Sequence, residues 1–423
     1  MYQIENTQPL LRGGWRGVLQ RSNWPRVSRN VFLLGLTSLF TDISSEMVAT
    51  ILPLYLVYSL GLSPLQFGAI DGLYNGATAV VRLASGVIGD RSRRHKEVAA
   101  VGYGISAVSR IAFLAAGSSL GALSAIVFAD RTGKGIRTAP RDALISLSVD
   151  RRDLGLAFGV HRALDTTGAM FGPLVAFVLL TLAPGSYDAI FVVSFCFALV
   201  GFSILVLFVQ NRTAPPGEQP HEVPASMRAA VDLLRDRRLQ VLVAVAAGLG
   251  LVTMSDGFLY LSLQRTLDFD PRVLPLLFVG TALVYMLLAV PMGRLADRVG
   301  RGKVFIGGYA LLLLAYGLLL LPDVGHGQLV VYLVLVGAYY AATEGVLMAL
   351  TSSITPPELR GSGLALIVTA TSLARLLASL AFGVIWTFAG MNAAIAAFAA
   401  GLLLGIPLAT VGLGRAKELR AYA

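Results

Sequence analysis

The chain has 423 residues, of which 56% are hydrophobic and only 14% are charged, whereas an ordinary soluble domain carries about 25% charged residues. This composition argues against a water-soluble enzyme, and the length accommodates twelve apolar spans of roughly 20 residues each. Lys and Arg outnumber Asp and Glu by 34 to 24, but the basic residues cluster between apolar segments, so we expect a lipid bilayer as partner and no nucleic acid.

Twelve apolar segments are predicted along the chain. The first six lie at 31–60, 66–89, 98–117, 120–148, 155–182 and 188–209. The second six lie at 239–263, 272–294, 303–321, 328–354, 361–387 and 391–413. We therefore expect an all-α polytopic membrane protein with twelve transmembrane helices in two six-helix bundles.

The same pattern divides the chain into five parts. They are an N-terminal segment over 1–30, a six-helix bundle over 31–210, a linker rich in proline and charge over 211–238, a second bundle over 239–413, and a tail over 414–423. Basic residues concentrate in the N-terminal segment, the linker, the tail and every second loop. The positive-inside rule then places both termini and the linker in the cytoplasm, and we expect the protein in a bacterial inner membrane.

One motif occurs in both halves. The segment GVIGDRSRRHK at 86–96 recurs as GRLADRVGRGK at 293–303, and each copy lies between the second and third spans of its half. The shared positions are Gly86, Asp90, Arg91 and Arg94 in the first copy and Gly293, Asp297, Arg298 and Arg301 in the second. Duplicated halves of this kind are the architecture of many secondary transporters.

These Gly-x-x-x-Asp-Arg-x-x-Arg loops resemble the signature of the major facilitator superfamily, and the resemblance covers the twelve spans and the central linker. It implies two bundles that rock around a central cavity. In the family, the aspartate of this loop meets the start of the eleventh span, which is here the segment 361–363. A carboxylate at a helix N-terminus is electrostatically favourable, so we expect Asp90 to hold the halves together on the cytoplasmic side.

The fourth predicted span carries several cations. Arg131 takes the position of an intramembrane arginine in a motif of the same superfamily, and Lys134, Arg137 and Arg141 share its helix face. Charges at this depth must face a partner or water. Two interpretations stay open: Arg131 and Lys134 contact the substrate or the coupling proton, or the stripe is a static scaffold paired with neighbouring aspartates.

The first predicted span places two acids, Asp42 and Glu46, one helical turn apart on a shared face. Two close carboxylates in a low-dielectric site do not both ionise easily, which suits a proton carrier. We expect them to couple protons together with Arg131. The alternatives are permanent neutralisation of the fourth-span cations, or a Na⁺ or divalent-cation site that includes Asp71.

The fifth predicted span contains Gly168, Gly172 and Pro173. They resemble the Gly-x-x-x-Gly-Pro motif of proton-driven drug exporters in the superfamily, although the motif's last glycine is replaced by Ala176. The glycines permit close helix packing, and the proline loosens the backbone where access can be gated. This resemblance implies export.

Further substrate-binding candidates are Arg110 in the third span and, in the second half, Tyr340 and Glu344, which lie one turn apart. The sequence contains no zinc-ligand spacing, Walker loop or nucleophile elbow. We therefore expect no enzyme activity, no metal site and no cofactor.

Together these features predict a monomeric secondary transporter that works by alternating access, driven by the proton gradient, and that exports a small organic solute or drug. Three alternatives remain: a proton-coupled importer of an anionic metabolite, a metal-cation transporter, and a membrane receptor without transport activity.

Overall fold

The computed structural model describes residues 28–77, 94–150, 153–212, 233, 235–321, 326–356 and 359–418. The first half contains α1 (Arg29–Leu54) with its π-helical continuation η2 (Tyr55–Ser59), a helical segment at 64–77, α3 (His95–Ala116), α4 (Leu120–Ser146), α5 (Leu154–Leu182) and α6 (Tyr187–Phe208). The second half contains α8 (Arg237–Gly250), α9 (Asp256–Leu267), α10 (Leu274–Val299), α11 (Arg301–Leu320), α12 (His326–Ile354), α13 (Arg360–Ala389) and α14 (Met391–Glu418).

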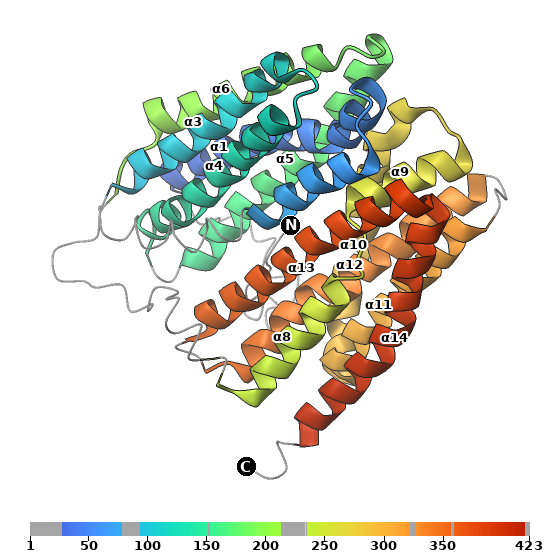
Figure 1. Ribbon diagram of the computed structural model, residues 1–423. Helices are drawn as coiled ribbons and strands as arrows, with labels where there is room; N and C mark the ends of the chain where they lie inside the picture. The colour runs from blue at the N-terminus through green and yellow to red at the C-terminus, as the bar shows by residue number, and fades with distance from the viewer. Residues whose placement is uncertain are drawn as a thin grey trace.

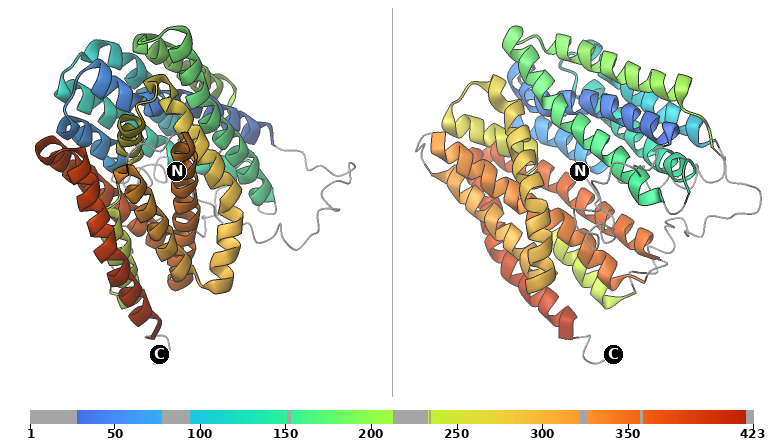
Figure 2. Two further views of the ribbon diagram at one scale, coloured as in Figure 1. Left: turned by 90° about the vertical axis from the view of Figure 1, so that its right-hand side faces the viewer. Right: turned by 180° about the vertical axis from the view of Figure 1, so that it is seen from behind.

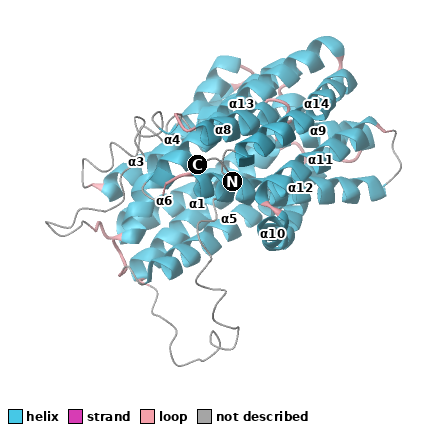
Figure 3. Ribbon diagram, turned by 90° about the horizontal axis from the view of Figure 1, so that it is seen from below, coloured by secondary structure: helices cyan, strands magenta, loops and turns pink. Residues whose placement is uncertain are grey.

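Within these ranges the secondary structure is entirely helical, as Figure 3 shows from below. Nine of the described helices are long and apolar enough to cross a membrane. Helix α4, the segment 64–77 and the pair α8 and α9 supply the other spans, so the twelve predicted spans are accounted for. The predicted all-α, twelve-span fold is confirmed.

The helices form two groups, shown from three sides in Figures 1 and 2. Helix α1 packs most extensively against α5 and α6, and α3 packs against α4. In the second group α12 packs against α10 and α11, while α8 packs against α13 and α14. Helix α9 lies between the two groups and contacts α1 as well as α10 and α11. The grouping places α1, α4, α9, α12 and α13 where their charged residues can meet.

The seventh span differs from the prediction, because the segment 239–263 is two helices with a break at 251–255. Ser255 begins the second of them by accepting a hydrogen bond from the backbone N–H of Phe258. The interrupted backbone finds side-chain partners: the N–H of Met254 donates to the Tyr316 hydroxyl at 2.7 Å, and that hydroxyl lies 3.3 Å from the carbonyl of Val252. Irregular backbone at membrane depth requires such substitutes.

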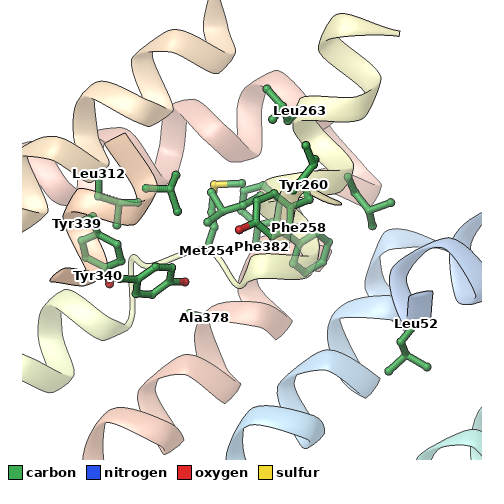
Figure 4. Close-up of a cluster of buried hydrophobic side chains, with 14 of the residues drawn as sticks. Leu52, Met254, Phe258, Tyr260, Leu263, Leu312, Tyr339, Tyr340, Ala378 and Phe382 are labelled. Atoms are coloured by element: carbon green, nitrogen blue, oxygen red, sulfur yellow. The ribbon is translucent and has the colours of Figure 1, made fainter. Parts of the chain in front are cut away.

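Apolar side chains surround the break. Figure 4 shows Met254 and Phe258 beside Phe382 of α13, with Tyr339 and Tyr340 of α12 nearby. The rings of Phe258 and Phe382 lie 4.7 Å apart, and Met254 is 1% exposed. The buried part of the break is therefore lined by apolar side chains, and the Tyr316 hydroxyl provides hydrogen bonds to its backbone.

We predict that Tyr316→Phe destabilises the protein by about 1–3 kcal/mol, because a buried backbone N–H loses its acceptor. The control is Tyr332→Phe. Tyr332 is fully buried, but its hydroxyl has no hydrogen-bond partner among the described residues, so its removal should change stability by less than about 0.5 kcal/mol. Thermal unfolding in detergent measures the stability of both variants. Equal losses of stability would contradict the role of the Tyr316 hydroxyl in supporting the break.

The second copy of the repeated motif is helical, not a loop. Helix α10 continues through Asp297 and Arg298 to Val299, and the chain turns at Gly300 with φ of 106°. Arg301 then donates to Asp297 at 2.9 Å and to the carbonyl of Ala349 at 3.1 Å. Asp297 is thus paired within its own motif, and Arg301 attaches α11 to α12.

Most of the first copy of the motif lies outside the described residues. This applies to Gly86, Asp90 and Arg91, and so to the predicted contact of Asp90 with α13, whereas Arg94 is described as an exposed residue immediately before α3. Gly293 and Arg298 lie on the last turns of α10, where an added Cβ at Gly293 would meet nothing within 4 Å.

Candidate functional site

Three charged residues of the third and fourth spans form one buried cluster. Arg110 of α3 lies 2.8 Å from one carboxylate oxygen of Asp130, and the Nε of Arg131 donates to the other oxygen at 2.9 Å. Arg110 also donates to Ser45 of α1 at 2.9 Å, and the guanidinium of Arg131 lies over the ring of Tyr74, 3.9 Å from its centre. The charged side chains are at most 5% exposed. This cluster matches the scaffold interpretation of the fourth span.

The acids of α1 are arranged differently from the prediction. The carboxyl of Asp42 lies within hydrogen-bonding range of the carboxyl of Asp165 on α5, so its acidic neighbour is Asp165 and not Glu46. A hydrogen bond between two carboxyl groups contains a proton, because an ionised carboxylate can only accept. Arg162 and Arg141 approach the far side of Asp165, at 3.3 Å and 3.8 Å.

Glycines of the fifth span make this carboxyl pair possible. A Cβ added at Gly168 would lie 2.3 Å from the carbonyl oxygen of Leu39, and one added at Gly172 would lie 2.7 Å from the Cβ of Glu46. Both glycines are buried on the α1 side of α5, and Pro173 is buried beside them. The predicted motif therefore serves the contact between α1 and α5 that brings Asp42 to Asp165.

Glu46 and Lys134 have no direct partner within the part of the chain that the structure describes. Both are partly buried and lie within electrostatic range of Arg131 and of each other. Neither side chain makes a hydrogen bond or ion pair with another described residue. A buried charge without a partner is costly, so these two are the charges of the first half that are available to a proton or a ligand.

The second half contributes four polar groups near the break in the seventh span. Tyr340 donates a hydrogen bond to Asp256. Glu344 and Arg375 are partly buried and interact electrostatically, but form no ion pair. Asp256 is also within electrostatic range of Glu46, which places the acids of α1 and α9 in one region between the bundles. Of the predicted pair on α12, Tyr340 is thus already occupied and Glu344 is not.

Two members of the site were not among the predicted site residues. Asp165 stands one turn after His161 near the start of α5, and its side chain is 8% exposed. Arg375 is a single cation in an otherwise apolar segment. Such a charge inside a membrane span was the one signal that could have identified it.

The two halves meet along the segment 64–77 and α13, which we call the seam. Ser379 donates to Asp71 at 2.5 Å, and the backbone N–H of Leu65 donates to Thr387 at 3.0 Å. A Cβ added at Gly68 would lie 2.5 Å from the carbonyl oxygen of Ser379. The seam therefore combines close backbone packing with two direct hydrogen bonds.

Further contacts extend the seam to the seventh span. Tyr58 donates to Gln264, and the ring of Phe67 packs edge to face on Phe258 with centres 4.8 Å apart. Asp71 lies here, while Asp42 is held by Asp165 on another helix. Among the described residues no group of three His, Cys, Asp or Glu side chains is placed to hold a metal ion.

We predict that Ser379→Ala opens the seam. The variant removes a hydrogen bond to a carboxylate, worth about 1.5–3 kcal/mol, which corresponds to a tenfold or larger shift between closed and open populations. Spin labels at Ser59 and Phe388, in a Cys196→Ser background, would report a longer distance. Thr369→Val on the same helix is the control, because its hydroxyl donates only to its own helix at Ala365. An unchanged distance distribution in Ser379→Ala would contradict this role.

The comparisons with known proteins agree with this architecture. The model of the Major Facilitator Superfamily matches residues 34–270 and 252–421. An uncharacterised MFS-type transporter of Methanocaldococcus jannaschii is 31% identical over 394 residues, which cover 89% of this chain and 94% of the relative.

Solved structures of transporters share the fold. The nucleoside transporter NupG superposes with a TM-score of 0.74 at 15% identity, covering 91% of this chain and 98% of that one. The POT family transporter PepTSo superposes with a TM-score of 0.76 at 12% identity, covering 93% and 99%. At these identities the likeness concerns the fold alone.

Proposed function

Because this chain belongs to the major facilitator superfamily and is a multi-pass membrane transporter, we propose that it exports a small organic solute in exchange for protons by alternating access. The observation that carries the proposal is the carboxyl pair of Asp42 and Asp165 between α1 and α5. It holds a proton inside the bundle, next to the cations of α4.

The proton is placed where its gain or loss changes local charge. Lys134 and Arg137 of α4 face Asp42, and Arg141 and Arg162 face Asp165. When the pair loses its proton, the added negative charge attracts these cations and draws α4 toward α1 and α5. A proton or solute that favours one arrangement over the other shifts the equilibrium between inward and outward states.

Two features support export as the direction of transport and the inner membrane as the location of the protein. The close packing of Gly168 and Gly172 on α1 corresponds to the motif of proton-driven exporters, which supports export. The seam lies at the ends of the spans that face the loops without basic residues, such as 61–64. With the positive-inside rule, this supports an inward-open form with cytoplasmic termini in a bacterial inner membrane.

Proteoliposomes with an internal pH dye test the proposal. Organic cations, anions, zwitterions and metal ions are added under an imposed pH gradient of either sign. Export by exchange predicts that a transported solute and protons move in opposite directions. Movement of an organic anion together with protons would instead indicate an importer, and exchange of protons for a metal ion would indicate a metal transporter. The absence of any flux would indicate a receptor. Each of these outcomes overturns the proposal.

A further inference from the structure

Arg375 lies at the middle of α13, fifteen residues after its first residue, Arg360. At 1.5 Å per residue this is about 22 Å into the helix. The side chain is partly buried. Its guanidinium has five N–H donors, yet it makes no hydrogen bond or ion pair with any described residue.

The other buried arginines of the described ranges behave differently. Arg110 and Arg131 are ion-paired to Asp130, Arg141 is ion-paired to Asp142, and Arg137 lies over the ring of Tyr103. The first three have a carboxylate in direct contact, and Arg137 has an aromatic ring, although its Nη1 is buried without a hydrogen-bond partner among the described residues. Arg375 has no described carboxylate in direct contact, although leaving a guanidinium unpaired at this depth is costly.

The surroundings of Arg375 come from α11 and α12. Its electrostatic neighbours are Tyr309, Tyr339, Tyr340 and Glu344. The rings of Tyr309 and Tyr339 lie 5.4 Å apart, and those of Tyr339 and Tyr340 lie 4.9 Å apart. The guanidinium is therefore surrounded by tyrosines, and two carboxylates lie within its electrostatic range: that of Asp256, to which Tyr340 donates, and that of Glu344.

The carboxylate of Glu344 is also incompletely satisfied. Its Oε2 is buried and has no hydrogen-bond partner among the described residues. No ion pair joins Glu344 to Arg375, so their charged atoms lie more than 4.0 Å apart. The hydroxyl of Tyr340 already donates to Asp256, so it cannot also donate to Glu344. The guanidinium of Arg375 and the carboxylate of Glu344 thus lie near each other, and each could form further hydrogen bonds.

We propose that Arg375 and Glu344 form a binding subsite for a zwitterionic head group, in which the guanidinium binds the carboxylate of the solute and the carboxylate of Glu344 binds its ammonium. A single amino-carboxylate satisfies both charges, whereas a simple anion or cation satisfies one. A guanidinium is suited to this because it binds carboxylates with two parallel hydrogen bonds. The surrounding tyrosines favour an aromatic or apolar body on the solute. This inference rests on the proposed transport function and names the class of its substrate.

Three probes of similar shape test the subsite: L-phenylalanine, which carries both charges, 3-phenylpropionate, which has only the carboxylate, and phenethylamine, which has only the ammonium. Binding to the full-length protein in detergent is measured by thermal shift at pH 7. We expect phenylalanine to bind best. Arg375→Gln should reduce the affinity for phenylalanine and for phenylpropionate by about tenfold or more, and should leave the affinity for phenethylamine unchanged.

The complementary variant gives the opposite pattern. Glu344→Gln should reduce the affinity for phenylalanine and phenethylamine and leave that for phenylpropionate unchanged. Arg375→Lys should retain part of the affinity that Arg375→Gln loses. Arg272→Gln is the control, because Arg272 pairs with Asp270 on an exposed turn. Failure of all three probes to bind the wild type, or equal responses of Arg375→Gln and wild type, would overturn the subsite.

The outcomes also separate the subsite from the transport proposal. If the probe pattern holds but the bound zwitterion moves no protons in proteoliposomes, the subsite stands and proton exchange fails. If another solute exchanges with protons and Arg375→Gln transports it normally, proton exchange stands and the subsite fails.

Discussion

Asp130→Asn is expected to destabilise the protein by about 3–5 kcal/mol, enough to abolish folded material at 37 °C in a marginally stable membrane protein. The carboxylate of Asp130 is the shared counter-charge of Arg110 and Arg131, and all three side chains are at most 5% exposed. An amide leaves two guanidinium groups buried side by side without compensation. Size-exclusion profiles and thermal unfolding in detergent would measure the loss.

The matched control lies twelve residues further along α4. Asp142→Asn also removes the partner of an arginine, since Asp142 lies 2.9 Å from Arg141, but the Asp142 side chain is 41% exposed. An ion pair of this exposure contributes about 0–1 kcal/mol. Equal stability of the two variants would show that Asp130 is not a structural counter-charge, and would return Arg110 and Arg131 to the substrate-binding role predicted from the sequence.

Glu46→Gln is expected to leave the fold intact and to reduce proton-driven transport about a hundredfold or more. The side chain makes no hydrogen bond or ion pair with a described residue, so the amide removes no structural contact. It does remove a carboxyl group that lies within electrostatic range of Arg131, Lys134 and Asp256. A group that neither gains nor loses a proton cannot link these charges to the pH gradient.

Glu97→Gln provides the comparison, because Glu97 is exposed in the first turn of α3 and takes no part in the site. Flux and the accompanying pH change are measured together in proteoliposomes, alongside melting temperature. A Glu46→Gln protein with normal proton-coupled flux would remove Glu46 from the coupling groups. A large drop in its melting temperature would assign the residue a structural role instead.

The spans could be predicted from the sequence because their signal is local. Runs of about 20 apolar residues and the alternation of basic loops depend on no tertiary contact, and the helix ends that fall within the described residues lie within a few residues of the predicted ones. The break in the seventh span escaped this reasoning. The segment 251–255 is no more polar than many continuous helices, and only Tyr316 of α11, 62 residues away from Met254, makes the interruption tolerable.

The site was predicted less completely, for a related reason. Helical spacing correctly placed Asp42 and Glu46 on one helix and the cations of α4 on another, but partner choice depends on how neighbouring helices rotate and approach. Asp130 rather than an acid of α1 neutralises Arg131, and Asp165 rather than Glu46 shares a hydrogen bond with Asp42. The second pairing depends on the close approach of α5 to α1 at Gly168, which no periodicity encodes.

The interruption of the seventh span has a mechanical consequence. Helix α8 is fastened to α13 and α14, while α9 carries Phe258 and Gln264 onto the first bundle. The stretch 251–255 between them interrupts the helix, so a change in the tilt of α9 would not force α8 to leave its packing. A tilt of α9 would separate these contacts with the first bundle, but it would also disturb the packing of Phe258 on Phe382 and the hydrogen bond from Tyr260 to Thr281 within the second bundle.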